Sequence, residues 1–119
     1  MDAEDIKART KNFALRVIQL SGSLPKNTPG QVMGRQVLRA ATSVGANYRA
    51  ALRARSKTEF IAKLGVVVEE ADECCYWLDL IIESDLVKKH RLQDLLSEAN
   101  QLTALFVATI KSAKRSRKS

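Results

Sequence analysis

The sequence predicts an all-α protein, in which four amphipathic helices pack as an antiparallel up-down bundle. Its 119 residues are enough for one domain. Aromatic residues make up only 5% of the chain, and two prolines and five glycines supply few turns, which nearly excludes an all-β fold. Apolar residues recur at alternating spacings of three and four in four segments joined by short links, as in helices that bury one face against each other.

The first helix is expected over about residues 3–23. Its stripe of regularly spaced residues has a single polar member, Thr10. The stripe consists of Ile6, Thr10, Phe13, Val17, Leu20 and Leu24. Residues 21–30 form the only stretch dense in Gly, Pro and Ser, so the helix is expected to end there.

The second helix is expected over about residues 29–54. Thr28 followed by Pro29 predicts its N-cap and its first helical position. Gly34 and Gly45 lie inside this helix, where each costs up to about 1 kcal/mol relative to Ala. Such glycines indicate close approach of another backbone, with tolerated weakness as the alternative.

The third helix follows a capping box, Ser56 to Glu59, and Phe60 opens its apolar run. Two neighbouring apolar stripes indicate that this helix packs on more than one neighbour. They consist of Phe60, Leu64, Val67, Ala71, Cys74, Leu78 and Ile81, and of Ile61, Val68, Cys75 and Ile82.

The last helix is expected to begin near Val87. The bundle is then expected to span residues 1–113, and residues 114–119 to form a basic tail. There is no internal repeat and no sign of a second domain. Because the apolar stripes are wide for a bundle of this size, the sequence also predicts oligomerisation.

The net charge of +7 favours an acidic partner such as nucleic acid, a membrane surface or an acidic protein, although solubility alone explains it equally well. Residues 24–55 contain six basic residues and no acidic one, whereas residues 56–87 are strongly acidic. Pairing between helices is one interpretation of this pattern, and a cationic surface for phosphates is the other. The candidate nucleic-acid-binding residues are Arg49, Arg53, Arg55, Lys114, Arg115, Arg117 and Lys118.

A line of polar residues shares one face of the second helix. Arg39, Ser43 and Asn47 stand four residues apart, and Gln36 lies beside them. Such side chains are expected to hydrogen-bond a neighbouring helix in a core or an interface, with a phosphate site as the less favoured alternative. We expect Arg39 to pack inward and Asn47→Leu to cost about 1–3 kcal/mol, because hydrogen-bond partners would be stranded.

The residues needed for catalysis or metal binding are scarce. The only histidine, His90, lies in a cationic segment, and no zinc, di-iron, phosphate-loop or dinucleotide pattern is present. Cys74 and Cys75 are adjacent and poorly placed to bond each other, as in a reducing cytoplasm. We therefore expect no enzyme activity, cofactor or metal, and a cytoplasmic protein without a signal peptide or membrane span.

Nearly the whole chain resembles the 23S rRNA intervening-sequence proteins, a family of bacterial four-helix bundles, and the segment from Arg39 to Phe60 is the most specific part of this resemblance. The matching motif residues are Arg39, Ser43, Asn47, Ser56 and Phe60. We expect these residues, together with Gln36, to be structural or interface residues. Arg49 and Ala50 stand where the family usually has an acidic residue and glycine, which makes the end of the helix more basic.

The resemblance implies assembly into five-membered rings. It also connects the chain with the accessory proteins of diversity-generating retroelements, which are basic pentamers that bind nucleic acid and a reverse transcriptase. We therefore expect a non-enzymatic homopentamer that binds RNA or DNA without sequence preference. The alternative is a structural scaffold whose partner is a protein, such as a reverse transcriptase.

Overall fold

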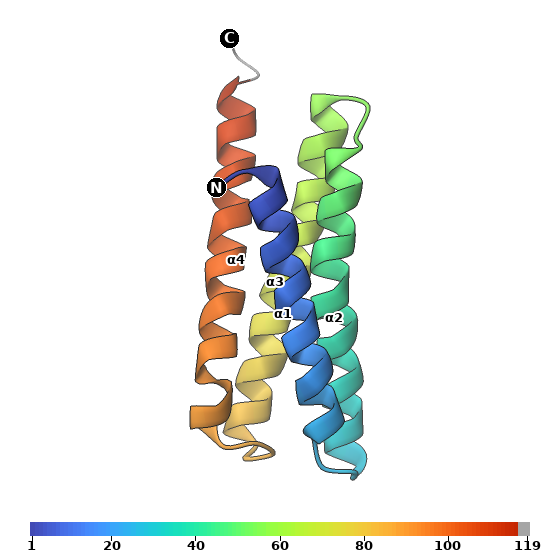
Figure 1. Ribbon diagram of the computed structural model, residues 1–119, viewed down its shortest axis with the longest axis vertical. Helices are drawn as coiled ribbons and strands as arrows, with labels where there is room; N and C mark the ends of the chain where they lie inside the picture. Colours follow the sequence, from blue (N-terminus) through green and yellow to red (C-terminus); the bar gives the residue numbers. More distant parts are fainter. Residues whose placement is uncertain (117–119) are drawn as a thin grey trace.

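The computed structural model describes residues 1–116, and within this range the chain forms four α-helices and no strand. They are α1 (Ala3–Ser23), α2 (Thr28–Leu52), α3 (Lys57–Glu83) and α4 (Lys89–Ser116). The molecule measures 52 × 21 × 20 Å. The α1–α2 and α3–α4 connections lie at one end, and the α2–α3 connection lies at the other (Figure 1). The prediction of an all-α fold with four helices is confirmed.

Helix α2 begins one residue earlier than the sequence indicated. Asn27 has extended backbone angles, and its side chain accepts a hydrogen bond of 2.9 Å from the amide of Gly30. Thr28 and Pro29 are therefore the first two helical residues, and the prediction that Thr28 is the N-cap was wrong. Asn and Thr both cap helices well, and a proline is tolerated in the first turn, so the pattern alone did not distinguish them.

The starts of α1 and α3 are also capped by side chains. Ser56 caps α3 as predicted, because its hydroxyl accepts a hydrogen bond of 3.1 Å from the amide of Glu59. The Glu59 carboxylate does not return a bond to the Ser56 amide, so the predicted capping box is only half formed. Asp2 and Asp5 form a reciprocal capping box at α1, which the sequence analysis did not predict. These caps satisfy amides that have no partner within the helix.

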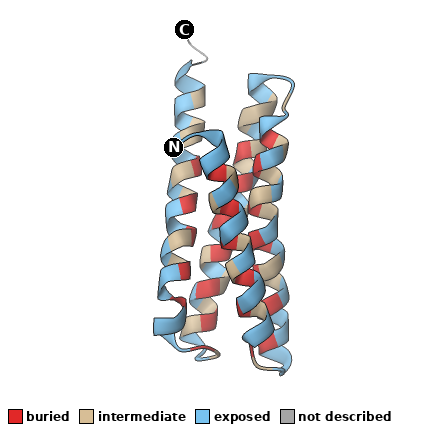
Figure 2. Ribbon diagram, viewed as in Figure 1, coloured by how far each residue is buried: buried red, intermediate tan, exposed pale blue. Residues whose placement is uncertain are grey.

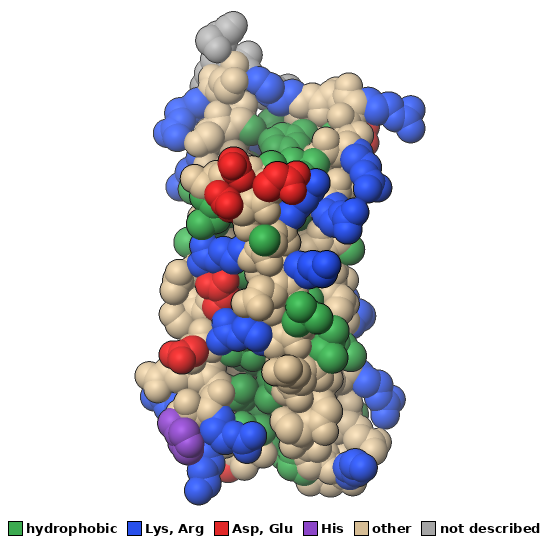
Figure 3. Space-filling model, viewed as in Figure 1, with side chains coloured by type: hydrophobic (Ala, Val, Ile, Leu, Met, Phe, Trp, Pro, Cys, Tyr) green, Lys and Arg blue, Asp and Glu red, His purple; other side chains and the backbone are tan. Residues whose placement is uncertain are grey.

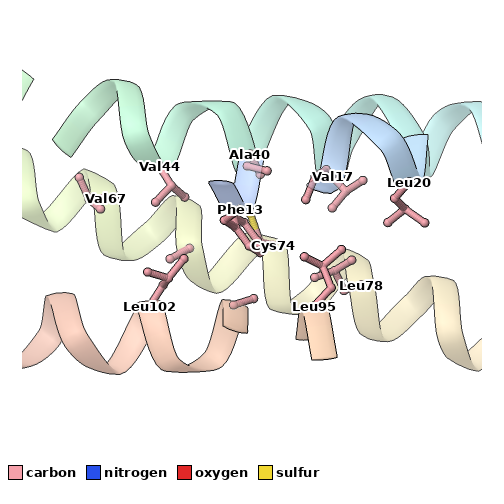
Figure 4. Packing of buried hydrophobic residues seen from close by; sticks show 14 of the residues in the cluster. Phe13, Val17, Leu20, Ala40, Val44, Val67, Cys74, Leu78, Leu95 and Leu102 are labelled. Atoms are coloured by element: carbon pink, nitrogen blue, oxygen red, sulfur yellow. The ribbon is translucent and has the colours of Figure 1, made fainter. Parts of the chain in front are cut away.

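The apolar stripes of the four helices meet in one core along the bundle axis (Figures 2 and 4). Phe13, Val17, Val44 and Leu102 are among its buried members. The polar member of the α1 stripe, Thr10, is only 1% exposed, and its hydroxyl donates to the carbonyl of Ile6 at 3.0 Å. A hydroxyl satisfied within its own helix therefore sits in the core without an unpaired polar atom.

The glycines of α2 mark close packing against α1, as predicted. A Cβ atom at Gly45 would lie 3.2 Å from the hydroxyl of Thr10, and one at Gly34 would lie 3.2 Å from a methyl of Leu24. Both distances are tighter than ordinary carbon contacts. The absence of a side chain at these positions lets α1 and α2 approach each other.

Helix α1 is joined to α4 by a polar contact that the sequence analysis missed. Arg9 donates from Nε and Nη2 to the two carboxylate oxygens of Glu98, each at 2.8 Å. Nη2 also donates to Gln101 at 3.0 Å. Such a two-pronged contact defines the relative position of the two helices more strictly than a single ion pair.

The two ends of α4 differ from the predicted boundaries. The helix begins at Lys89, while Val87 is buried in the preceding link. It continues to Ser116, so Lys114 and Arg115 belong to the helix rather than to a tail. Lys57 donates from Nζ to the hydroxyl of Ser116 at 3.0 Å, which places the end of α4 against the start of α3.

Candidate nucleic-acid interface

Basic residues from two separate parts of the chain lie at the same end of the bundle. The contact between Lys57 and Ser116 brings together the α2–α3 connection and the last turn of α4. The two segments stand at the same end in Figure 1, and Lys and Arg side chains project around this end in Figure 3. We call the residues Arg49, Arg53, Arg55, Lys114 and Arg115 the basic end.

All five residues of the basic end are exposed. None of them makes an ion pair with another residue in the range 1–116. The other two predicted nucleic-acid-binding residues, Arg117 and Lys118, lie outside the described residues. Exposed cations without acidic partners are suited to phosphate contacts. Cations near the carboxyl ends of α2 and α4 also complement the helix dipoles, which is their structural role.

Acidic residues border the basic end on the side of α1. Asp2, Glu4 and Asp5 occupy the cap and first turn of α1, which begins below the ends of the other helices (Figure 1). Burial raises the pKa of the Tyr48 phenol, and the carboxylates of Asp2 and Glu4 raise it further. The negative first turn of α1 therefore leaves the α2–α3 and α4 sides as the phosphate-facing part of this end.

The polar line of α2 behaves differently from the prediction at Arg39. Its side chain is 51% exposed, so the expected inward orientation was wrong. Arg39 forms ion pairs with Glu70 at 3.2 Å and with Glu73, both on α3. The indole of Trp77 donates to Glu73 at 3.1 Å, and this hydrogen bond, followed by the hydrogen bond and the positive charge of Arg39, lowers the pKa of the Glu73 carboxyl. Arg39 therefore links α2 to α3 at the surface, where its long stem allows both packing and solvation.

The remaining members of this line bond within their own helix. Ser43 donates to the carbonyl of Arg39, and Asn47 donates through Nδ2 to the carbonyl of Ser43, each at 2.8 Å. Gln36, Ser43 and Asn47 are half-buried. Within residues 1–116, Arg39 is thus the one member of the line that donates hydrogen bonds to a neighbouring helix. Replacing Asn47 strands no partner on another helix.

Phe60, the last of the motif residues, is half-buried and packs against the core one turn after the Ser56 cap.

Two further cations, Lys57 at the start of α3 and Lys111 on α4, also lie exposed near the basic end. Neither residue was among the predicted nucleic-acid-binding residues. Their nearness to the basic end depends on how the helices pack, which the residues around them in the sequence do not indicate.

The two cysteine thiols and the histidine are not placed as activated catalytic groups. Burial raises the pKa of the Cys74 and Cys75 thiols, which are both free. His90 is exposed. Across residues 1–116, no three acidic, histidine or cysteine side chains gather as a metal site. None of the four helices in this range has an apolar stretch of the length that a membrane span requires.

Comparison with known proteins extends over all four helices. The family model described as 23S rRNA-intervening sequence protein matches residues 4–108. Among solved structures, the chain is similar to a protein of unknown function from the S23 ribosomal protein family of Bacteroides thetaiotaomicron. The two share 33% sequence identity over 89% of this chain and 98% of that chain, with a TM-score of 0.83. No curated protein matches the chain.

Proposed function

The chain belongs to the 23S rRNA-intervening sequence protein family, and from this premise we propose that it is a non-enzymatic, oligomeric helical-bundle protein that binds nucleic acid. The bundle is the antiparallel up-down type, and five copies form a ring, as the family resemblance implies. The ligand is RNA or DNA, bound without sequence preference. The protein acts in the cytoplasm.

The observation that carries this proposal is the basic end. Five exposed cations from α2, the α2–α3 connection and α4 stand at one end of the bundle without acidic partners in residues 1–116. Phosphate contacts of this kind release counterions and depend strongly on salt. In a ring, every subunit repeats the basic end, so that weak contacts add up through avidity.

The side chains of the basic end favour contacts with the phosphate backbone of the nucleic acid over recognition of its bases. Its members are Arg and Lys on helix ends and in a connection, and side chains of this kind contact phosphates, which carry no sequence information. The most exposed aromatic residue, Tyr76 at 60%, lies within α3 rather than at this end. Binding is therefore expected to be indifferent to sequence.

A fluorescence-anisotropy titration with a mixed-sequence RNA tests the proposal at about 50 and 200 mM salt. The test variant is Arg53→Gln/Arg55→Gln/Arg115→Gln, three members of the basic end. The control variant, Lys88→Gln/Lys89→Gln/Arg91→Gln, removes the same charge at the opposite end of the bundle.

We expect the test variant to bind at least about tenfold more weakly than the native protein at 50 mM salt, and the control variant to change less than about threefold. Affinity of the native protein should fall steeply between the two salt concentrations. Absence of RNA binding at low salt, or an equal loss in both variants, would contradict the proposal.

A structural scaffold that binds a protein, such as a reverse transcriptase, is the second candidate. The acidic outer side of α3 with the exposed Tyr76 favours it, because this side offers charge and an aromatic anchor for a protein surface. Protein binding that persists at 200 mM salt without RNA binding would support the scaffold instead.

The oligomer has its own test in light scattering. Leu15 and Ile18 on α1 are 51% and 47% exposed, and contiguous apolar surface of this kind favours association. A ring of five copies has a mass of about 66 kDa, whereas the single chain has 13.2 kDa. A species of single-chain mass throughout the micromolar range would refute the oligomer.

A further inference from the structure

A groove runs along the bundle between α1 and α2. One hollow, of about 520 Å³, lies toward the start of α1, where three cations, Lys7, Lys11 and Arg49, and one carboxylate, Glu4, line it together with small residues. A second hollow, of about 570 Å³, lies toward the α1–α2 connection, and Lys26 and Arg35 are among its lining residues. Both ends of this α1–α2 groove are therefore cationic.

The middle of the α1–α2 groove is apolar. Leu15 and Ile18 follow Lys11 on the same face of α1 and are about half exposed. Leu38 approaches from α2 and lines the second hollow. Figure 3 shows hydrophobic side chains flanked by Lys and Arg on this face of the molecule. Only Lys7 among the groove cations has an ion pair within the described chain, with Glu4 at 3.2 Å.

The outer side of α3 carries the opposite pattern. Five exposed residues at spacings of three and four form one line, which we call the acidic stripe: Glu69, Asp72, Tyr76, Asp79 and Glu83. None of its four carboxylates pairs with a cation within residues 1–116. A hydrogen bond to Asp79 and repulsion from its charge raise the pKa of Glu83. The two carboxyl groups at this end of the stripe therefore lie close enough to repel each other.

The α1–α2 groove and the acidic stripe have about the same length and the same arrangement of charged ends around an uncharged centre. By helical rise, Arg35 and Arg49 lie about 21 Å apart along α2, and Glu69 and Glu83 are separated by about the same distance along α3. In each surface, charges at both ends flank an uncharged centre. The centre is Tyr76 in the stripe and the Leu15, Ile18 and Leu38 side chains in the groove.

We propose that the α1–α2 groove binds the acidic stripe of a second copy of this chain. This contact rests on the oligomer of the proposed function and assigns its two surfaces. The carboxylates pair with the groove cations, and the Tyr76 ring packs on the aliphatic centre. Because the two surfaces are different parts of the chain, the contact is head-to-tail, the type that closes into a ring when its rotation allows.

A charge-reversal experiment tests this contact by light scattering at about 10 μM protein and moderate salt. The groove variant is Lys11→Glu/Arg35→Glu, the stripe variant is Asp72→Lys/Asp79→Lys, and the third protein carries all four changes. Arg49 is left unchanged because it also belongs to the basic end. All four positions are exposed, and circular dichroism verifies that each protein keeps its helices.

We expect the groove variant and the stripe variant each to dissociate to the 13.2 kDa chain, and the combined protein to recover the native mass. A second measurement does not depend on charge. A mixture of Leu15→Cys and Tyr76→Cys chains, both carrying Cys75→Ser to remove the half-buried free thiol beside Tyr76, should form a covalent dimer on oxidation, and neither chain alone should do so.

Two results would overturn the contact while leaving the oligomer intact. One is a native mass in both reversed variants. The other is a groove variant that loses RNA affinity without a change of mass, which would make the groove part of the nucleic-acid site. A native protein that is monomeric at every concentration would overturn the contact together with the proposed oligomer.

Discussion

The start of α2 depends on the absence of a side chain at Gly30. A Cβ atom there would lie 2.1 Å from the carbonyl oxygen of Pro25, a distance that real Cβ atoms essentially never show. It would also lie 3.1 Å from the capping oxygen of Asn27. We therefore expect Gly30→Ala to destabilise the protein, although alanine is normally the better helix former.

The magnitude follows from three contributions. The Pro25 carbonyl must move by roughly 1 Å, a local overpacking that typically costs about 1–3 kcal/mol. Movement of this loop weakens the 2.9 Å bond from the Gly30 amide to Asn27, and loss of a cap costs about 1 kcal/mol. The helix propensity of alanine returns at most about 1 kcal/mol. The net loss is about 1–3 kcal/mol, or roughly 4 °C of melting temperature for each kcal/mol.

Urea unfolding followed by circular dichroism measures this change, with all proteins at one concentration because oligomers gain stability with concentration. Gly65→Ala is the matched control, since a Cβ atom at Gly65 in α3 meets nothing within 4 Å. We expect the control to gain up to about 1 kcal/mol. A Gly30→Ala protein as stable as Gly65→Ala would refute the reasoning.

Two further substitutions test the polar line of α2 and its partners. Asn47→Leu should change the free energy of unfolding by less than about 1 kcal/mol, because its acceptor, the Ser43 carbonyl, belongs to the same helix; a loss above 2 kcal/mol in urea unfolding would argue against this. Because the pKa of Glu73 is lowered in the folded state, its contribution is present above the unfolded pKa and is lost as pH falls through the folded pKa. Glu73→Gln should thus flatten the loss of stability below about pH 5, and unchanged acid sensitivity would contradict this.

The sequence by itself determined the four helices and the residues that face the core. The stripes of α1 and α3 became buried because helical periodicity is a local property, and apolar faces of this width have to be covered. The cap at Ser56 follows equally from local chemistry, since its partner amide lies three residues away. The close approach at the glycines of α2 could also be predicted, because a helix tolerates a residue of low helix propensity where another helix packs closely against it.

Only the tertiary structure decided which way the charged residues point and which of them meet. Arg39 was expected to pack inward from its spacing with Ser43 and Asn47, yet Glu70 and Glu73 of α3 hold it at the surface. The basic end, the α1–α2 groove and the acidic stripe likewise depend on how helices are placed around the axis. A long charged side chain has weak local preferences, so its surroundings are set by elements distant in sequence, whereas burial of an apolar face is set by the period of its own helix.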